Sequence, residues 1–199
     1  MEMKNAQEIM GENFVGPKEI KNIYGVDSQK FPLVPFNENQ LIANKDSHVL
    51  IATFPISILN IKKVFGKKIF FWEKSAWYND EPFAKDRGRI GWELVKKSPT
   101  EASTDKTLTE QIKLLKKGGI IPTAQTMVYA IATYYAITDK FLLGQFSVRT
   151  SSQNLKGSPV EVGVVREEWI IVNCSSESRK STLLGLAEAI RSDPFPQKE

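Results

Sequence analysis

The sequence predicts an α+β fold in a single domain, with a mainly antiparallel sheet packed against a central buried helix and an αα-hairpin. The longest apolar segment, residues 120–143, has the spacing of a helix. β-Rich runs stand on both sides of it, at residues 48–54, 67–72, 92–97 and 145–174. The only short connection between two of these runs is a hairpin turn, and strands and helices do not alternate regularly. The pattern therefore favours α+β over a doubly wound α/β fold.

The predicted central helix begins near Pro122, where a missing N–H costs nothing, and ends near Asp139. Met127, Val128 and Ile131 fall on one face at helical spacing. Threonine and glutamine residues interrupt the segment, so it is too polar and too short to span a bilayer. We expect a buried helix around which the other elements pack.

Before this helix, residues 1–13 are polar and predict a flexible N-terminus. A short helix is expected from Pro17 to a stop at Gly25, and another at residues 37–44. Between them, the prolines of residues 31–36 favour an extended edge segment. A buried strand is predicted at 48–54, a helix at 56–65 ending at Gly66, and a strand at 67–72.

Residues 75–89 are rich in turn-forming residues, and 92–97 alternate like a half-exposed strand with Glu93 on the solvated face. A helix at 108–117 ends at a pair of glycines and is followed at once by the central helix, which predicts the αα-hairpin. Strands are expected at 145–150, 160–165 and 169–174, the last two as a hairpin. The apolar spacing of 181–191 predicts a helix, and 193–199 a flexible tail, so the domain covers residues 14–192.

Composition narrows the functional classes. Cys174 is the only cysteine and His48 the only histidine, which excludes an internal disulfide and a zinc site built from several cysteines or imidazoles. No cofactor and no metal are predicted. The net charge of +4 is spread evenly along the chain, so a nucleic acid is a disfavoured partner. The N-terminal residues lack the apolar core of a secretory signal, and we expect a cytoplasmic protein without a membrane segment.

Three patterns were compared with known catalytic motifs, and none has the spacing or the neighbouring residues that the motif requires. Gly11 and Gly16 have the spacing of a phosphate loop, but Pro17 stands where its lysine belongs. Glu93 and Lys96, considered with Asp80 as a nuclease-like set, are three apart and point to opposite faces of a strand. A dyad of His48 and Cys174 lacks an Asp or Asn partner in the pattern.

Two stretches remain as candidate binding sites. Trp77, Tyr78 and Asp80 lie in an aromatic, turn-rich loop before Trp92, near several basic residues. Such aromatic side chains can anchor a protein partner or stack on nucleic-acid bases. The alternative interpretation is that they cover one end of the sheet as part of the core.

The second stretch is a polar corner at a predicted strand end, where one guanidinium and three hydroxyls come together: Arg149, Thr150, Ser151 and Ser152. These groups could cradle an oxyanion or phosphate. The alternative interpretation is that they form the turn after the strand.

An ordered series of residues also resembles uncharacterised bacterial proteins over roughly residues 14–190. The residues that carry the resemblance are Trp72, Trp77, Tyr78, Glu81, Pro82, Phe83, Ala84, Gly91, Trp92, Leu94, Val95, Pro122, Thr123, Ala124, Val128, Tyr129, Val148, Arg149, Thr150, Ser151 and Ser152. The resemblance implies a bacterial or phage-related cytosolic origin and brings no activity with it.

The first functional hypothesis is a non-enzymatic binding module that uses the aromatic loop and the Arg149–Ser152 corner, with a protein or a small anionic ligand as partner. The alternative is a hydrolase or transferase acting on a phosphorylated or nucleic-acid substrate through Asp80, Glu81, Glu93 and Arg149. Nucleic-acid binding without chemistry is a third hypothesis, and it predicts affinity that falls steeply with salt.

Overall fold

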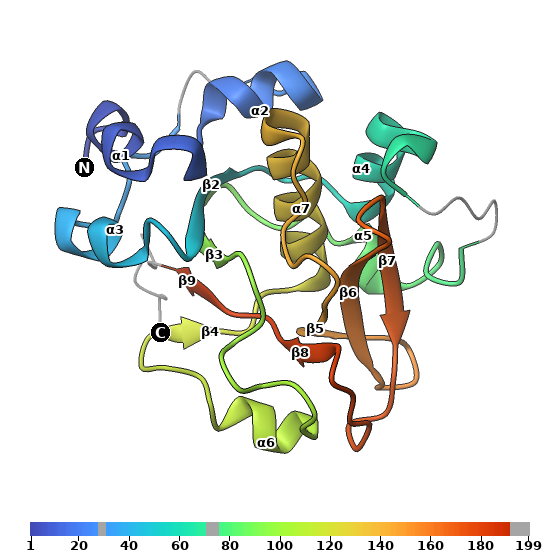
Figure 1. The fold of residues 1–199 in the computed structure, drawn as a ribbon. Coiled ribbons are helices and arrows are strands. Elements are labelled where there is room, and N and C mark those ends of the chain that lie inside the picture. Colours follow the sequence, from blue (N-terminus) through green and yellow to red (C-terminus); the bar gives the residue numbers. More distant parts are fainter. Residues whose placement is uncertain (28–30, 71–75, 192–199) are drawn as a thin grey trace, which may run out of the picture.

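The computed structural model describes residues 1–27, 31–70 and 76–191, and it confirms the α+β class (Figure 1). The helices of these residues are α1 (Met3–Met10), α2 (Pro17–Tyr24), α3 (Glu38–Asn44), α4 (Ile58–Phe65), α5 (Pro82–Lys85), α6 (Leu108–Ile112) and α7 (Ala124–Thr138), with 3-10 turns η1 (Gly11–Asn13) and η2 (Gly66–Lys68). The strands are β1 (Phe14–Val15), β2 (His48–Thr53), β3 (Gly91–Lys96), β4 (Gly119–Ile120), β5 (Ser147–Gln153), β6 (Pro159–Val165), β7 (Trp169–Cys174), β8 (Leu184–Leu186) and β9 (Ala189–Arg191).

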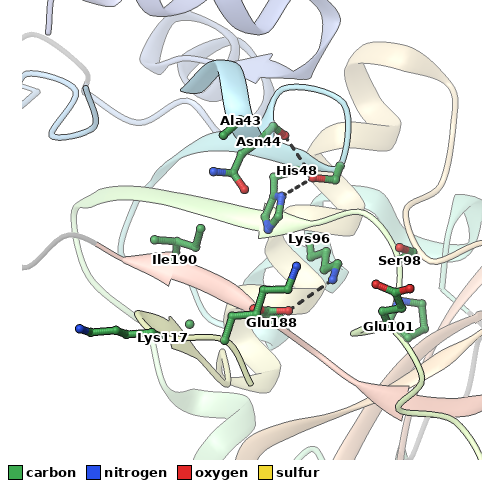
Figure 2. Close-up of a pocket in the computed structure, with 13 residues that line it drawn as sticks. Ala43, Asn44, His48, Lys96, Ser98, Glu101, Lys117, Glu188 and Ile190 are labelled. Carbon is green, nitrogen blue, oxygen red and sulfur yellow. Dashed lines mark hydrogen bonds and ion pairs between the residues drawn. The ribbon is translucent and has the colours of Figure 1, made fainter. Parts of the chain in front are cut away.

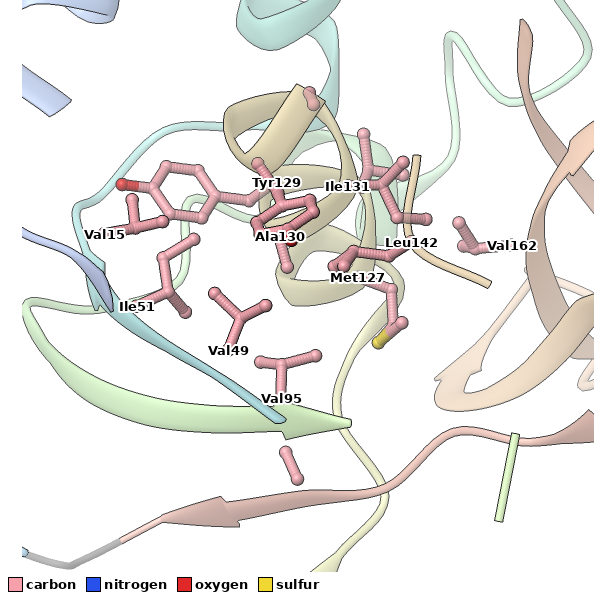
Figure 3. Close-up of a cluster of buried hydrophobic side chains, with 14 of the residues drawn as sticks. Val15, Val49, Ile51, Val95, Met127, Tyr129, Ala130, Ile131, Leu142 and Val162 are labelled. Atoms are coloured by element: carbon pink, nitrogen blue, oxygen red, sulfur yellow. The ribbon is translucent and has the colours of Figure 1, made fainter. Parts of the chain in front are cut away.

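Helix α7 is the predicted central helix, and it is buried from Ala124 to Tyr134. The Thr123 hydroxyl caps its start by accepting the Thr126 N–H, and Asp139 ends it in the left-handed conformation with φ 58°. Figure 3 shows side chains of one sheet, such as Val49 and Val95, on one side of α7 and Val162 of the other sheet on the opposite side. A helix packed on several sides is apolar around most of its circumference, which explains its sequence.

The first sheet has the order β1-β2-β3-β9-β4. Its centre is the antiparallel pair β2–β3, which runs in register from His48 opposite Lys96 to Thr53 opposite Gly91. Every residue of β2 is buried, as expected of a strand flanked on both edges and covered by α7. The register places His48 and Lys96 side by side at one end of the sheet.

The second sheet has the order β7-β6-β5-β8. Strands β6 and β7 form the predicted antiparallel hairpin, with Val165 opposite Trp169. Strand β8 pairs parallel with β5 on the other edge. Both sheets are therefore mixed, and α7 lies between them (Figure 1).

The helix predicted at 181–191 is wrong, because this segment forms β8 and β9. Its leucines do have helical spacing, but the backbone finds partners elsewhere. The Leu186 N–H donates to the Ser103 hydroxyl, and the Ala187 N–H donates to the Arg149 carbonyl. Pairing with strands that are distant in sequence outweighs a weak local helical preference.

The predicted αα-hairpin is also wrong. Helix α6 ends at Ile112, and β4 separates it from α7 because Gly119 and Ile120 pair with β9. The glycines that predicted a tight link between two helices instead let the backbone run close to Glu188. A Cβ at Gly119 would lie 2.8 Å from a Glu188 carboxylate oxygen.

The N-terminal residues were expected to be flexible, and the structure instead folds them as α1 and η1, with Ala6 and Met10 buried against the core. The amino group of Met1 donates to the Val34 carbonyl at 2.6 Å, which ties the chain start to the segment before α3. Of the strand predicted at 67–72, residues 67 and 68 belong to η2 and Phe70 makes a single bridge to Ile170. Residues 71 and 72 and the predicted tail at 193–199 lie outside the described residues.

Within the described parts of the chain, no helix has the length and apolar character needed to cross a membrane.

Candidate functional site

Arg149 lies inside the protein. Its side chain is fully buried, and its two terminal nitrogens donate to the carbonyl oxygens of Lys106, Ser176 and Arg179 and to Oε1 of Gln111. These hydrogen bonds connect the guanidinium to the loop before α6, to α6 itself and to the loop after β7. Burial lowers the pKa of Arg149, and Glu161 opposes this effect. The side chain holds loops together and presents no cradle to solvent.

The other three residues of the corner do not line a common surface with it. The Thr150 hydroxyl is buried and donates to the Val160 carbonyl at 2.9 Å. The Ser152 hydroxyl accepts the Ala124 N–H at 3.0 Å and so helps to cap α7. Ser151 is exposed, and its N–H donates to the Pro122 carbonyl. The corner thus joins β5 to the start of α7.

The aromatic loop covers the edge of the second sheet. The Trp77 indole N–H donates to the Val172 carbonyl of the edge strand β7 at 2.8 Å, and the ring is 39 % exposed. Tyr78 is buried, with the Lys62 ammonium 5.2 Å from its ring centre. Asp80 is exposed and lies 3.8 Å from the Lys85 ammonium. These contacts favour the interpretation in which the loop closes a sheet edge.

Trp92 lies apart from that loop. It is a buried residue of β3, its indole N–H donates to the Pro32 carbonyl at 2.9 Å, and its ring contacts Phe14 and Phe31. Trp92 therefore anchors the extended segment before α3 to the first sheet.

The residues proposed for chemistry do not converge either. Glu81 accepts the Leu155 N–H, and Glu93 and Arg149 belong to different sheets, each with partners of its own. The prediction that Glu93 lies on a solvated face is wrong, because Glu93 is 2 % exposed and paired with Arg191. His48 and Cys174 also lie in different sheets, and Cys174 is exposed beside Asn154.

A different group of residues forms a pocket of about 550 Å³ at the end of the first sheet. We call it the His48 pocket, and its polar lining consists of Asn44, Ser47, His48, Lys96, Ser98, Glu101, Lys116, Lys117 and Glu188 (Figure 2). The α3–β2 connection supplies the first three residues, β3 and the following turn the next three, the approach to β4 the two lysines, and the β8–β9 link Glu188. Its volume lies within the range of small-molecule sites.

His48 is the most unusual residue of this pocket. Its ring is 6 % exposed, Nδ1 lies 2.8 Å from the Ser47 hydroxyl, and Nε2 is buried without a hydrogen-bond partner among the described residues. Figure 2 shows the ring directed into the space beside Lys96 and Ile190. A buried nitrogen that makes no hydrogen bond is costly, and a bound ligand could satisfy it.

The charges around His48 make a positive environment. The pKa of His48 is lowered to about 4, mainly by burial and then by the ammonium groups of Lys96, Lys116 and Lys97, against the opposing effect of Glu188. The imidazole is therefore neutral at pH 7. The same positive potential that disfavours protonation of His48 would stabilise an anion bound beside it.

Two contacts fix Lys96 within the pocket. Its ammonium lies 3.4 Å from a carboxylate oxygen of Glu188, and the same oxygen accepts the Thr100 hydroxyl at 3.2 Å. Lys96 is mostly buried, so its position is held by packing as well as by charge. The ion pair keeps one carboxylate occupied inside the protein, and the exposed Lys116 brings a further ammonium to the lining.

The arrangement is better suited to binding than to nucleophilic chemistry. A serine hydrogen-bonded to a histidine can act as an activated nucleophile when a third group orients the ring. Here Nε2 has no such partner among the described residues, and a pKa of about 4 makes the imidazole a weak base at neutral pH. The described residues also include no group of three or more His, Cys, Asp and Glu placed to hold a metal ion.

Comparisons with protein-family models, with curated proteins and with solved structures found no match to this chain. The geometry of the pocket is therefore the basis for the function proposed below.

The sequence pattern could not reveal this pocket, because Asn44, Lys96, Lys116 and Glu188 come from four distant segments. One signal was available. His48 is the only histidine, and it stands at the start of a buried strand next to a serine.

Proposed function

We propose that this protein is a non-enzymatic binding domain for a small oxyanion, a molecule that carries carboxylate or phosphate groups, and that the ligand occupies the His48 pocket. The observation that carries the proposal is that His48 lines the same cavity as three lysines and that its buried Nε2 makes no hydrogen bond among the described residues. In the neutral tautomer whose Nδ1 accepts the Ser47 hydroxyl, Nε2 carries the hydrogen and would donate it to an oxygen of the ligand.

The electrostatics support an anion over a cation. Lys96, Lys116 and Lys117 line the pocket with Glu101 and Glu188, and Lys96 and Thr100 already occupy a Glu188 oxygen. Ammonium groups act as point charges that attract oxyanions without demanding one geometry. The hydroxyls of Ser47 and Ser98 and the Asn44 amide add neutral hydrogen-bonding groups for orientation.

Isothermal titration calorimetry on the full chain tests the proposal, with inorganic phosphate, citrate and adenosine monophosphate as probes at constant ionic strength. We expect saturable binding of at least one probe. Lys116→Ala should weaken it by about tenfold or more, because a partly desolvated charge contact contributes over 1 kcal/mol. His48→Phe, which keeps a ring of similar size but removes the nitrogens, should weaken it to a similar extent.

Lys156→Ala is the matched control, because it removes the same charge from an exposed loop outside the pocket. It should change affinity less than about twofold through the net charge alone. Glu101→Gln should strengthen binding, since it removes a negative charge from the lining. Absence of saturable binding for every probe, or binding that Lys116→Ala and His48→Phe leave intact, contradicts the proposal.

A further inference from the structure

A second, smaller cavity lies beneath the start of α7, away from the His48 pocket. It has a volume of about 220 Å³, and its lining includes Thr53 of β2, Glu93 of β3, Arg191 of β9 and Gln125 of α7, with Asp86 and Arg89 from the loop before β3. We call it the Glu93 pocket. None of these residues belongs to the lining of the His48 pocket.

Two residues that line this cavity each have a buried oxygen without a hydrogen-bond partner in the described part of the chain. Oε1 of Glu93 accepts Nε of Arg191 at 3.0 Å and a terminal nitrogen of Arg191 at 2.5 Å, but Oε2 makes no hydrogen bond among the described residues. The Thr53 hydroxyl is in the same situation. Glu93 and Thr53 are 2 % and 7 % exposed, so water outside the protein does not satisfy them. Buried polar groups of this kind ordinarily have partners, and a ligand that donates hydrogen bonds would provide them.

The two oxygens face the same way. Glu93 stands opposite Ile51 in the β2–β3 ladder, and Thr53 follows Ile51 by two residues. Residues two apart in a strand share a face, so the carboxylate and the hydroxyl lie on the side of the sheet that α7 covers. Together they form a hydrogen-bond-accepting wall, in which Arg191 already pairs with the other oxygen of Glu93.

The facing wall carries Arg89 together with Asp86, whose carboxylate accepts the Gly88 N–H at 3.0 Å. Arg89 lies close enough to Glu93 to lower the pKa of its carboxyl, against the larger effect of burial, which raises it. The start of α7 adds the positive end of a 15-residue helix. The loop that carries Arg89 is pressed against this helix, because a Cβ at Gly88, where φ is +66°, would lie 2.5 Å from Oε1 of Gln125.

From these two walls we infer that the Glu93 pocket binds a small zwitterion, a free amino acid with a short side chain. The ligand's ammonium group would donate to Oε2 of Glu93 and to the Thr53 hydroxyl, and its carboxylate would face Arg89 and the start of α7. The cavity volume restricts the side chain to a few atoms. An ammonium against Oε2 also compensates the buried carboxylate, whose charge burial alone disfavours.

Thermal shift and calorimetry with the full chain test this inference. Glycine, L-alanine and L-serine should each bind saturably and raise the melting temperature. Acetate and ethylamine, which carry only one of the two charges, should bind at least tenfold more weakly at the same concentration. L-Phenylalanine should not bind, because its ring exceeds the space. The inference is overturned if none of the three small amino acids binds, or if acetate alone or phenylalanine binds as well as they do.

Variants locate the binding. Glu93→Gln removes the charge but keeps the size, and it should weaken amino-acid binding at least tenfold. Because it also breaks a buried ion pair, Thr53→Val provides the same test without touching Arg191, and it should weaken binding by about fivefold. Lys156→Ala, which removes a charge from an exposed loop outside both pockets, is the control and should leave amino-acid affinity unchanged. Unchanged affinity in both Glu93→Gln and Thr53→Val would overturn the assignment.

Discussion

His48 shows how one side chain responds to four surrounding charges. It starts β2 and faces Lys96 on β3, Lys97 just after β3, Lys116 before β4 and Glu188 in the β8–β9 link. Burial and the three ammonium groups hold its pKa at about 4, while the ordinary value for an imidazole is 6.5. The His48 imidazole therefore binds a proton more weakly in the folded protein than in the unfolded chain.

The lowered pKa of His48 makes the free energy of unfolding depend on pH. Above pH 6.5 the imidazole is neutral in both states and contributes no pH dependence. Between pH 6.5 and 4 the unfolded chain binds a proton that the folded protein does not, so stability falls as pH falls. The slope from one group is at most about 1.4 kcal/mol per pH unit. His48→Gln should remove this contribution.

Urea denaturation of the wild type and His48→Gln at several pH values from 4.5 to 8 measures the effect. The difference in free energy of unfolding between the two proteins should be constant above pH 7. Below pH 6.5 the wild type should lose stability relative to His48→Gln as the pH falls. Carboxylates that titrate in the acid range affect both proteins alike and cancel in the difference. Parallel profiles across the whole range would show that His48 is protonated as easily in the folded state as in the unfolded one.

At the scale of elements, Arg149 connects strand β5 with a helix and two loops that lie in separate parts of the sequence. From β5 it reaches Gln111 of α6, the loop that precedes α6 and the loop that follows β7. Gln111 is itself buried, and its amide donates to the carbonyls of Ser103 and Leu184. The short helix α6 is thus held in place mainly by polar contacts around one guanidinium.

Arg149→Lys should lower the free energy of unfolding by about 2 kcal/mol or more, because a lysine ammonium lacks the planar fork and leaves buried carbonyl oxygens without donors. Arg166→Lys is the matched control at an exposed turn, and it should change stability by less than about 0.5 kcal/mol. Guanidinium chloride denaturation measures both. An Arg149→Lys protein as stable as the control variant would mean that water replaces the lost contacts.

At the scale of the whole molecule, β8 and β9 connect the two sheets. Strand β8 pairs with β5 in the second sheet, and β9 lies between β3 and β4 in the first. The link between them is fixed as well, since the Lys96 N–H donates to the Glu188 carbonyl and the Ala187 N–H donates to the Arg149 carbonyl. The segment 184–191 therefore couples the stability of one sheet to that of the other.

Ile190→Pro tests this coupling. Proline in an internal strand removes a hydrogen-bond donor of the ladder and leaves its acceptor unpaired, which costs about 1–3 kcal/mol. Ile190→Val, the control, keeps the donor and should cost about 0.5–1 kcal/mol. Amide hydrogen exchange on the proline variant should increase in β2 and β3 and also in β5 and β6. Faster exchange confined to the first sheet would show that the two sheets open independently.

The features that could be predicted from the sequence are those set by neighbours along the chain. The helical spacing of residues 124–138 and the short turn between β6 and β7 are local, and both were predicted. The pairing of β8 and β9 is not, because it depends on partners tens of residues away. The His48 pocket could not be predicted for the same reason. Arg149 resembled part of an open anion site in the sequence, because its burial depends on loops whose positions no local pattern reveals.

β8 and β9 follow the strands with which they pair, and this order constrains folding during synthesis. While a ribosome is still adding residues before 184, the emerging polypeptide holds β3 and β5 with one side unpaired. Both sheets are completed only once residues 184–191 have cleared the exit tunnel. Until then β3 and β5 each keep one edge without its final strand partner, and such unpaired edges are prone to aggregation.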